Sequence, residues 1–426
     1  MDKLAIYGGK RVIPENTFKP WPPIGQLDKK YIIEALKSRK LTYEPYCVAF
    51  EKEFAEWNGN KFAINTNSGT AALHMCVAAC GLGTGDHVLV SAYSWSSSAT
   101  CILHHNCIPV FVDIDFDTMN IDTKKIEAAI TPKTKAIIVV HLHGLAVNMD
   151  EVLAVAKKHK LFVIEDACQA HGALFKGKKV GTFGHCAAFS FNQNKCLCSG
   201  EGGMFVTDDE GIYKNARQLW SFGEIRTPAE SRDYHAYALG WMYRSNAITA
   251  AFGRAQLTRL DDYIKVQREN ASILLDLLKG TPNLILPTEP KYHSHTWYNF
   301  TLRINMKNIS YDVNPARYRD AVVKAIQAEG GNVGVWQSFI LPAMTVFQAH
   351  NAYGKGCPWS CPYTEPISYD VDKYPIAQLH CDTHFGMTYP IRMPHKKKEV
   401  KLMAEAIRKV FYQLDKIDPD KILRKE

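Results

Sequence analysis

The sequence predicts an α/β protein built on a largely parallel sheet of seven strands, followed by a smaller α+β unit. Short apolar runs alternate with helical patterns through the first two-thirds of the 426 residues. These runs are continuously apolar, which is typical of strands that are covered on both faces of a parallel sheet. From about residue 284 onward, strands and helices follow one another in a different rhythm that is typical of an α+β unit.

The predicted strands of the large sheet are short apolar runs bounded by polar or turn-forming residues. Helical patterns separate the early strands, and residues 208–240 are mostly polar and contain Gly223 and Pro228, so we expect a loop there. The strands are predicted at residues 62–65, 88–91, 109–114, 136–141, 162–165, 187–191 and 204–206, and the early helices at 70–80, 96–105, 123–129 and 149–158.

Two helices, predicted at residues 247–260 and 261–278, lead into the second unit, and Gly280 and Pro282 end the second of them. We therefore divide the chain into an N-terminal arm (1–28), a large domain (29–260), and a connector helix with a small C-terminal domain (261–426). In this last part we expect a strand at 297–303, a helix at 315–329, a short strand at 334–336, a Gly/Pro/Cys loop at 354–363 and a closing amphipathic helix at 397–414.

Composition excludes several classes of protein. The net charge of +8 is spread along the chain and no nucleic-acid module accompanies it, so we expect no nucleic-acid partner. No apolar run approaches the roughly 20 residues that a membrane span needs, and the first residues lack the apolar core of a signal peptide. We expect a cytoplasmic protein whose twelve cysteines stay reduced. Cys357 and Cys361 are the only pair worth testing as metal ligands, and we predict no metal.

Lys195 is the first candidate for chemistry, because it follows the strand predicted at 187–191. It is flanked by Cys196 and Cys198, and desolvation in such a semi-apolar setting can make a lysine amine nucleophilic. A lone lysine is more often an ordinary surface residue. The glycine-rich stretch 199–203 favours the functional interpretation, since it predicts a tight turn at which backbone can approach a bound group closely.

Three further features fall at predicted strand ends. Asp166 follows the strand at 162–165, where a parallel sheet binds ligands, although an aspartate there also suits a helix N-cap. Residues 67–70 form a small-residue turn before a helix, which suits either a phosphate site or a plain cap. Trp95 follows the strand at 88–91 and could stack on a flat ligand, with core packing as the alternative.

Together these features suit one ligand that has a phosphate, a flat ring, a basic ring nitrogen and an aldehyde. Pyridoxal 5′-phosphate (PLP) has all four. Lys195 would form the Schiff base, and Asp166 would keep the ring nitrogen protonated, so that the ring acts as an electron sink. The other expected contacts are Trp95 over the ring, and Gly69, Thr70 and Ser190 at the phosphate.

Beyond this reasoning, the sequence resembles the DegT/StrS-type aminotransferases, which are PLP-dependent sugar and cyclitol aminotransferases of fold type I. The resemblance runs from about residue 41 to 260 and thins over the rest of the chain. It rests on residues 67–73, 85–88, 109–115, 165–173, 190–191, Lys195 with 200–203, and 256–257.

The resemblance implies a role for each matching residue. Lys195 would carry the cofactor and act as the proton-transfer base, and Gln169 would lie near the ring hydroxyl of PLP. Asp166 would face the ring nitrogen and Trp95 would stack on the ring, while Gly69, Thr70 and Ser190 would hold the phosphate.

The resemblance also implies a homodimer with shared active sites. In the family, an asparagine before the helix at 247–260 reaches the phosphate of the partner subunit. Met242 occupies that position here, so we expect Asn246 or Arg244 to replace it as a cofactor-binding residue.

The implied activity is transfer of an amino group from glutamate or glutamine to a keto-sugar or keto-cyclitol. Residues 6–10 and 21–23 look more like the branch of scyllo-inosose aminotransferases and 3-amino-5-hydroxybenzoate synthases, and acceptor specificity is expected on loops 221–233 and 354–363. A PLP-type sugar dehydratase is one alternative, but those enzymes carry histidine where this chain has Lys195. A non-catalytic PLP-binding regulator is the other alternative, and a turnover assay would distinguish it from an aminotransferase.

Overall fold

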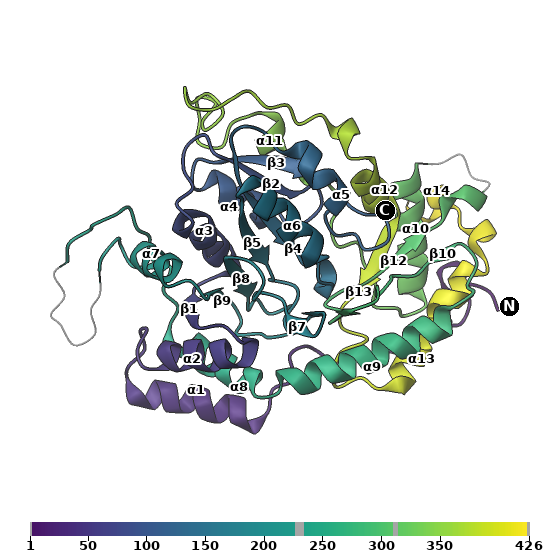
Figure 1. The fold of residues 1–426 in the computed structure, drawn as a ribbon. Helices are drawn as coiled ribbons and strands as arrows, with labels where there is room; N and C mark the ends of the chain where they lie inside the picture. The colour runs from purple at the N-terminus through teal and green to yellow at the C-terminus, as the bar shows by residue number, and fades with distance from the viewer. Residues whose placement is uncertain (1, 226–233, 310–313, 424–426) are drawn as a thin grey trace.

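A seven-stranded sheet forms the centre of the computed structural model, which describes residues 2–225, 234–309 and 314–423. The strand order is β1-β9-β8-β5-β4-β2-β3, and only β9 runs antiparallel to its neighbours (Figure 1). All seven predicted strands are confirmed with bounds shifted by at most two residues. They are β1 (Phe62–Thr66), β2 (His87–Ser91), β3 (Ile108–Val112), β4 (Thr134–Val140), β5 (Phe162–Asp166), β8 (Cys186–Ser190) and β9 (Gly203–Thr207).

The helices between these strands lie against the sheet and bury its apolar residues. Helix α3 packs against β8 and β9, and helix α6 packs against β5. Strands β2, β3 and β9 are buried along their whole length, as the continuous apolar runs predicted. The four early helices are confirmed as α3 (Gly69–Ala79), α4 (Ser97–Leu103), α5 (Thr123–Ile126) with the 3-10 turn Glu127–Ala129, and α6 (Met149–His159).

The loop predicted at residues 208–240 is wrong in its first part, which forms helix α7 (Glu210–Trp220). Asp209 caps this helix by accepting a hydrogen bond from the backbone N–H of Ile212. Ile212, Ala216 and Trp220 recur every four residues and are the buried side of the helix. The many polar residues on the opposite side masked this period of one helical turn. Residues 226–233 of the predicted specificity loop lie outside the described residues.

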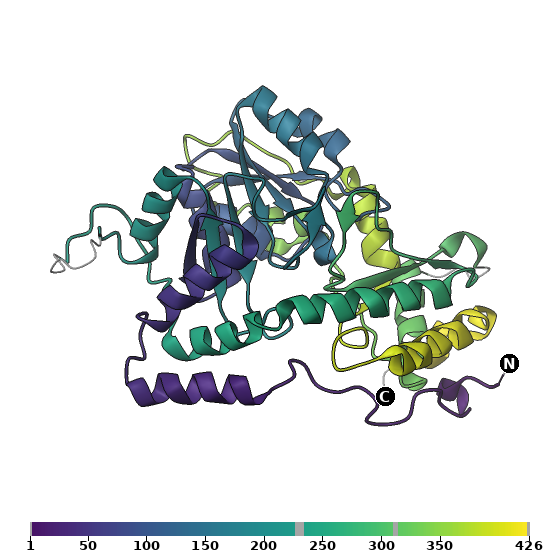
Figure 2. The same cartoon turned by 60° about the horizontal axis from the view of Figure 1, so that its bottom comes forward.

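Helices α8 (Ala247–Leu257) and α9 (Leu260–Leu278) follow each other as predicted, and α9 leads to the second unit (Figures 1 and 2). The closing helices are confirmed as α10 (Pro315–Ala328) and α13 (Lys397–Phe411). The predicted strand 297–303 begins only at Phe300 in β12 (Phe300–Ile304), because Trp297 has a φ of 57° and leaves the extended conformation. The strand predicted at 334–336 is reduced to a single bridge between Gly334 and Gly386.

Most of the buried apolar residues fall into two large hydrophobic cores. The first surrounds the large sheet, and Ile340, Phe347 and Tyr369 from the C-terminal third belong to it. The second lies among α9, α10, α13 and β12, and it also contains Leu4 and Ile13 from the N-terminal arm. Figure 2 shows that arm passing from α1 (Gln26–Ser38) to the side of the closing helices. The boundaries at residues 28 and 260 stay a prediction.

None of the helices in the described residues combines the length and the apolar character that a membrane span requires. The remaining elements include α2 (Tyr46–Asn58), β6 (Leu174–Phe175), β7 (Lys178–Lys179), β10 (Leu284–Ile285), β11 (His293–Ser294), α11 (Thr345–Gln348), α12 (Pro375–Thr383), β13 (His384–Met387) and α14 (Pro419–Ile422).

Candidate active site

A cavity of about 340 Å³ opens at the carboxyl ends of strands β1, β2, β5 and β8. This is the edge at which parallel sheets bind ligands. Seven of the eight residues predicted for the site line this cavity: Gly69, Thr70, Trp95, Asp166, Gln169, Ser190 and Lys195. Asn246 is not among the residues that line it.

The N-terminus of helix α3 forms one wall of the cavity. Ser68 caps the helix, and its Oγ accepts a hydrogen bond of 3.1 Å from the N–H of Ala71. The first N–H groups of a helix have no acceptor inside the helix, and the helix dipole adds positive potential there, so this wall suits a phosphate. A Cβ added at Gly69 would lie 2.7 Å from Ser190 Cβ, so only glycine allows the start of α3 and the end of β8 to approach this closely.

Asp166 ends strand β5 and is 4% exposed. Its Oδ2 accepts a hydrogen bond of 2.6 Å from Ser98 Oγ, and its Oδ1 accepts one of 3.1 Å from the N–H of Cys168. Residues 167–173 form turns and not a helix, so the alternative interpretation of Asp166 as a helix cap is wrong. The carboxylate is held in place at the cavity wall, where it could accept a hydrogen bond from a protonated ring nitrogen.

Lys195 lies in the loop after β8 and is anchored by the fully buried residues that follow it, Cys196 and Leu197. Its Nζ donates a hydrogen bond of 3.2 Å to the hydroxyl of Tyr298 and lies 4.5 Å from the centre of that ring. The amine therefore points into the cavity, against an aromatic wall, and the interpretation as an ordinary surface lysine is wrong.

Trp95 and Gln169 lie on other walls of the cavity. Trp95 is 54% exposed, so core packing is not its role, and its ring centre lies 6.3 Å from that of Trp336. Gln169 is buried, and its Oε1 accepts a hydrogen bond of 2.9 Å from the N–H of His143. The two tryptophans give the cavity a large aromatic surface that a flat or ring-shaped ligand can contact.

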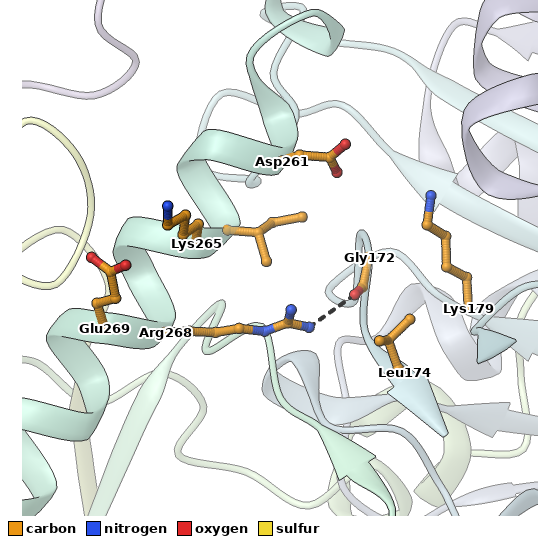
Figure 3. Close-up of a pocket in the computed structure, with 8 residues that line it drawn as sticks. Gly172, Leu174, Lys179, Asp261, Lys265, Arg268 and Glu269 are labelled. Atoms are coloured by element: carbon orange, nitrogen blue, oxygen red, sulfur yellow. Dashed lines mark hydrogen bonds between the residues drawn. The ribbon is translucent and has the colours of Figure 1, made fainter. Parts of the chain in front are cut away.

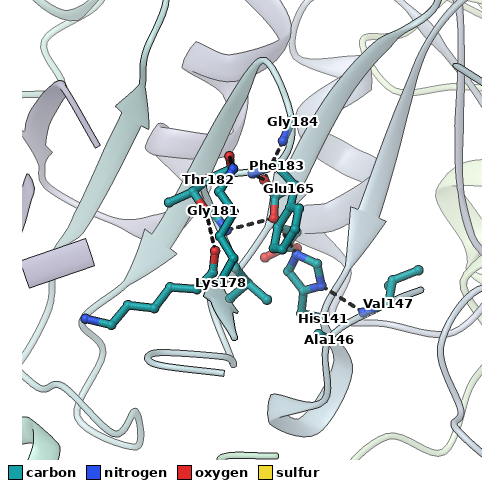
Figure 4. A network of polar contacts seen from close by, with 12 residues as sticks. His141, Ala146, Val147, Glu165, Lys178, Gly181, Thr182, Phe183 and Gly184 are labelled. Carbon is teal, nitrogen blue, oxygen red and sulfur yellow. Dashed lines mark hydrogen bonds and ion pairs between the residues drawn. The ribbon is translucent and has the colours of Figure 1, made fainter. Parts of the chain in front are cut away.

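A buried network beside Asp166 fixes the end of strand β5 (Figure 4). Glu165 pairs with His141 Nε2 at 2.9 Å and accepts hydrogen bonds of 2.7 Å from the N–H groups of Gly181, Phe183 and Gly184. Burial raises the pKa of Glu165, but these hydrogen bonds outweigh it and hold the pKa below its usual value. The carboxylate therefore stays charged and ties the 181–184 turn to the sheet.

Asn246 caps helix α8: its Oδ1 accepts hydrogen bonds from the N–H groups of Ile248 and Thr249. The preceding residues lie beside the α3 N-terminus of the same chain. The N–H of Asn67 donates to the carbonyl of Tyr243 at 2.9 Å, and Arg244 forms a bridge with Thr66. The segment 242–246 is therefore close to the phosphate-binding wall, while the cofactor contact of Asn246 stays a prediction.

Sequence reasoning missed several residues of the site, including a serine and three residues from the last third of the chain. Ser98 belongs to the serine-rich stretch 96–98, and that stretch was its only signal. The others come from the last third of the chain, where the resemblance is thin, and nothing in the local sequence marks them. They are Tyr298 and Trp336, which line the cavity, and Arg392, which contacts the loop of Lys195.

A second, wider groove of about 440 Å³ lies between α9 and the β6–β7 hairpin (Figure 3). Arg268 crosses it and donates to the carbonyl of Gly172 (Figure 3) and to those of Ser294 and His295. None of the candidate site residues lines this groove, so the groove is separate from the candidate active site. Among the described residues, no three His, Cys, Asp or Glu side chains gather in a way that could hold a metal ion.

Comparison with known proteins decides the family. Residues 22–385 match the DegT/DnrJ/EryC1/StrS aminotransferase family. The chain belongs to this family. It is 40% identical over 275 residues to GDP-perosamine synthase of Escherichia coli O157:H7, which covers 64% of this chain and 74% of the relative. It is 33% identical over 315 residues to L-glutamine:2-deoxy-scyllo-inosose aminotransferase of Streptomyces lividus, covering 71% and 74%.

Among solved structures, 3-amino-5-hydroxybenzoic acid synthase matches with a TM-score of 0.82 at 26% identity, covering 93% of this chain and 99% of that one. The protein is thus an aminotransferase of the sugar and cyclitol type, with pyridoxal 5′-phosphate as cofactor. The residues present fit that cofactor: a glycine wall without room for a Cβ, a buried carboxylate and a lysine amine converge on one cavity.

Proposed function

We propose that the protein transfers an amino group from glutamate or glutamine to the ketone of a sugar or cyclitol. The observation that carries this proposal is the Nζ of Lys195, which faces the same cavity as Asp166 and the α3 N-terminus. The names of the relatives support the substrate class, because they include a GDP-perosamine synthase and a glutamine-dependent inosose aminotransferase.

In this proposal each residue has one task. When bound, the cofactor supplies an aldehyde that takes up the amino group and a ring that delocalises the electron pair released at the substrate carbon. Ser190 and the N–H groups at Gly69 and Thr70 hold the phosphate. Asp166, oriented by Ser98, keeps a proton at the ring nitrogen.

Lys195 is the nucleophile toward the aldehyde and then the base that moves the proton. The hydroxyl of Tyr298 accepts a hydrogen bond from its Nζ and so holds the amine where the proton has to move. Trp95 covers the ring. Trp336 lines the same cavity and provides a face on which the C–H groups of a sugar or cyclitol ring can pack.

Two observations favour different amino acceptors. The N-terminal residues favour a free cyclitol, whereas the 40% identity to a GDP-perosamine synthase favours a nucleotide-linked keto-sugar. The purified protein loaded with PLP should lose its visible absorption band when the correct amino donor is added, with glutamate, glutamine and alanine compared. Subsequent addition of a keto-cyclitol or of a nucleotide-linked 4-keto-sugar should restore the band only for the accepted class.

Failure of every amino donor to change the visible band would contradict the proposed transamination and would favour the non-catalytic regulator. A band that responds to donors but is restored by neither acceptor class would contradict the proposed acceptor chemistry alone.

We also propose a homodimer in which Arg244 or Asn246 of the partner subunit approaches the cofactor phosphate. The support is the family membership and the position of the segment 242–246 beside the α3 N-terminus. Isologous twofold dimers are the commonest assembly of soluble oligomers. Light scattering tests the assembly, and a fully active monomer would contradict the shared site.

A further inference from the structure

A buried arginine, Arg392, lies directly behind the Lys195–Tyr298 pair. It is 1% exposed. Its Nη1 donates a hydrogen bond of 2.8 Å to the carbonyl of Asn194, and its Nη2 donates one of 3.1 Å to the carbonyl of Tyr298. Asn194 immediately precedes Lys195, so one side chain joins the backbone segments of the two residues whose side chains meet in the cavity. Because the guanidinium is planar and rigid, it fixes how far apart these segments lie.

Trp21 of the N-terminal arm completes this arrangement. Its indole ring lies 4.8 Å from the guanidinium carbon of Arg392, and its Nε1 donates a hydrogen bond of 3.0 Å to the carbonyl of Lys195 itself. Trp21 is 6% exposed and packs edge-on against Tyr263 of α9. The backbone of Lys195 is therefore held at two consecutive carbonyls, by residues from opposite ends of the chain.

The charge of Arg392 argues that it does more than fill space. Burying a guanidinium is costly unless it is paired, and a well-packed apolar side chain is often as stabilising. Within the part of the chain that the structure describes, no carboxylate lies within ion-pair distance of Arg392. Backbone carbonyls and the rings of Trp21, Tyr298 and Tyr389 surround it instead. A guanidinium can donate to the carbonyls of Asn194 and Tyr298 at once, which an apolar side chain of similar size cannot do.

We propose that Arg392 and Trp21 are positioning residues, which hold the Nζ of Lys195 against the hydroxyl of Tyr298. Neither side chain lines the cavity, so both act through the backbone of the catalytic loop. The proposal rests on the proposed function, in which Lys195 moves the proton. It assigns the N-terminal arm a part in catalysis that its distance along the sequence from Lys195 does not suggest.

The test compares Arg392→Lys and Arg392→Met with Trp21→Phe. Lysine keeps the positive charge but loses the fork, whereas methionine loses both. If geometry is what matters, both Arg392 variants should lower kcat of the half-reaction with the amino donor by about 100-fold, while KM for the donor changes little. Trp21→Phe keeps the ring but loses the N–H to Lys195, and it should lower kcat by about 10-fold.

A second readout does not depend on the reaction. Hydrogen–deuterium exchange of the cofactor-free protein should be faster in the peptide that contains residues 190–198 in all three variants, because the loop has lost an anchor. Arg268→Lys is the matched control. Arg268 is also an arginine bonded to backbone carbonyls, but it lies in the groove of Figure 3, and its variant should leave this peptide and kcat unchanged.

Faster exchange together with a lower kcat, in Arg392→Lys and Trp21→Phe alike, supports the proposal. If residues 190–198 exchange at the wild-type rate in Trp21→Phe and Arg392→Lys, the proposal is overturned. This readout needs no amino donor, so it decides the proposal even if the proposed function fails. If the Arg392 variants fail to fold, Trp21→Phe alone decides in the same way. A drop in kcat that is equally large in Arg268→Lys also overturns it, because the effect would then follow from losing any such arginine.

Discussion

At the scale of single residues, the surroundings of Lys195 separate it from the other lysines of the chain. Its amine meets a hydroxyl and an aromatic ring in a cavity, and the residues after it are fully buried. Lys214, by contrast, is an exposed lysine that pairs with Glu210 one helical turn away on α7. The difference lies in what each side chain faces, and it is this setting that suits a lysine to nucleophilic and base chemistry.

Lys195→Ala should abolish transamination while leaving the fold intact. The proton transfer loses its base and the cofactor loses its anchor, so kcat should fall by about three orders of magnitude or more. Single-turnover kinetics with the amino donor measure the loss, and circular dichroism checks the fold. Lys214→Ala is the control and should retain full activity. Transamination at more than about a few per cent of wild type in Lys195→Ala would show that another residue is the base.

The part of the site that could be predicted is the part that lies at strand ends. Gly69, Asp166 and Lys195 each follow an apolar run, Ser190 lies near the end of one, and the carboxyl ends of parallel strands meet at one edge. Tyr298 could not be predicted in this way, because it lies on a connecting segment before β12 whose path depends on tertiary packing. The same is true of Arg392, whose contacts with Asn194 and Tyr298 span a long distance in sequence.

At the scale of elements, helix α3 and strand β8 meet so closely that only glycine fits at position 69. Gly69→Ala should weaken PLP retention about 10-fold or more, because the added Cβ would clash with Ser190 and push the helix terminus away from the phosphate. Dialysis against cofactor-free buffer, followed by absorbance, measures retention. Gly83→Ala is the matched control, since nothing lies within 4 Å of a Cβ added there. Equal PLP loss in the two variants would remove the phosphate role from Gly69.

Helix α8 allows the proposed shared site to be tested apart from helix capping. Asn246→Ala removes the cap and should lower the free energy of unfolding by about 1 kcal/mol. Asn246→Ser keeps a capping oxygen but loses the amide, so it should leave stability nearly unchanged. If the amide of the partner subunit's Asn246 reaches the phosphate, both variants should release PLP faster. If PLP retention is unchanged in the serine variant, Asn246 serves only as a cap.

Helix α7 shows what limits prediction at this scale. Its buried residues, Ile212, Ala216 and Trp220, are only three in eleven, and the polar remainder looks like a loop when it is judged by composition. The period of four residues was present in the sequence, but only the contact of Trp220 with Asn65 on β1 shows which face is buried. Tertiary packing therefore decided an element that composition alone assigned wrongly.

At the scale of the whole molecule, the two cores are joined by more than the connector helix α9. Ile340, Phe347 and Tyr369 come late in the sequence and pack into the core of the large sheet, while Leu4 and Ile13 come first and pack into the other core. Each end of the chain therefore crosses between the two cores. Strand periodicity could not predict this, because it reports which residues are buried and not which core they enter.

Buried histidines, spread over the molecule, should make the fold sensitive to acid. Burial lowers the pKa of four of them to about 3, namely His74, His171, His295 and His384. Nearby lysine or arginine charges add to the effect at His171, His295 and His384. The unfolded chain takes up protons on these residues from about pH 6.5 downward, while the folded protein resists until about pH 3. Stability is therefore fully present above about pH 6.5 and is lost as the pH falls toward 3.

His171→Leu should reduce this sensitivity, because it removes one of these groups from a site packed between Phe189 and Phe191. Each such histidine contributes up to about 1.4 kcal/mol of lost stability per pH unit below 6.5. Urea unfolding at pH 7.5 and pH 5 should show a smaller difference in the variant, by about 2 kcal/mol. His235→Leu, at an exposed position, is the control and should keep the wild-type difference. If His171→Leu and wild type lose the same stability between the two pH values, His171 is protonated in the folded protein and its burial does not set the acid response.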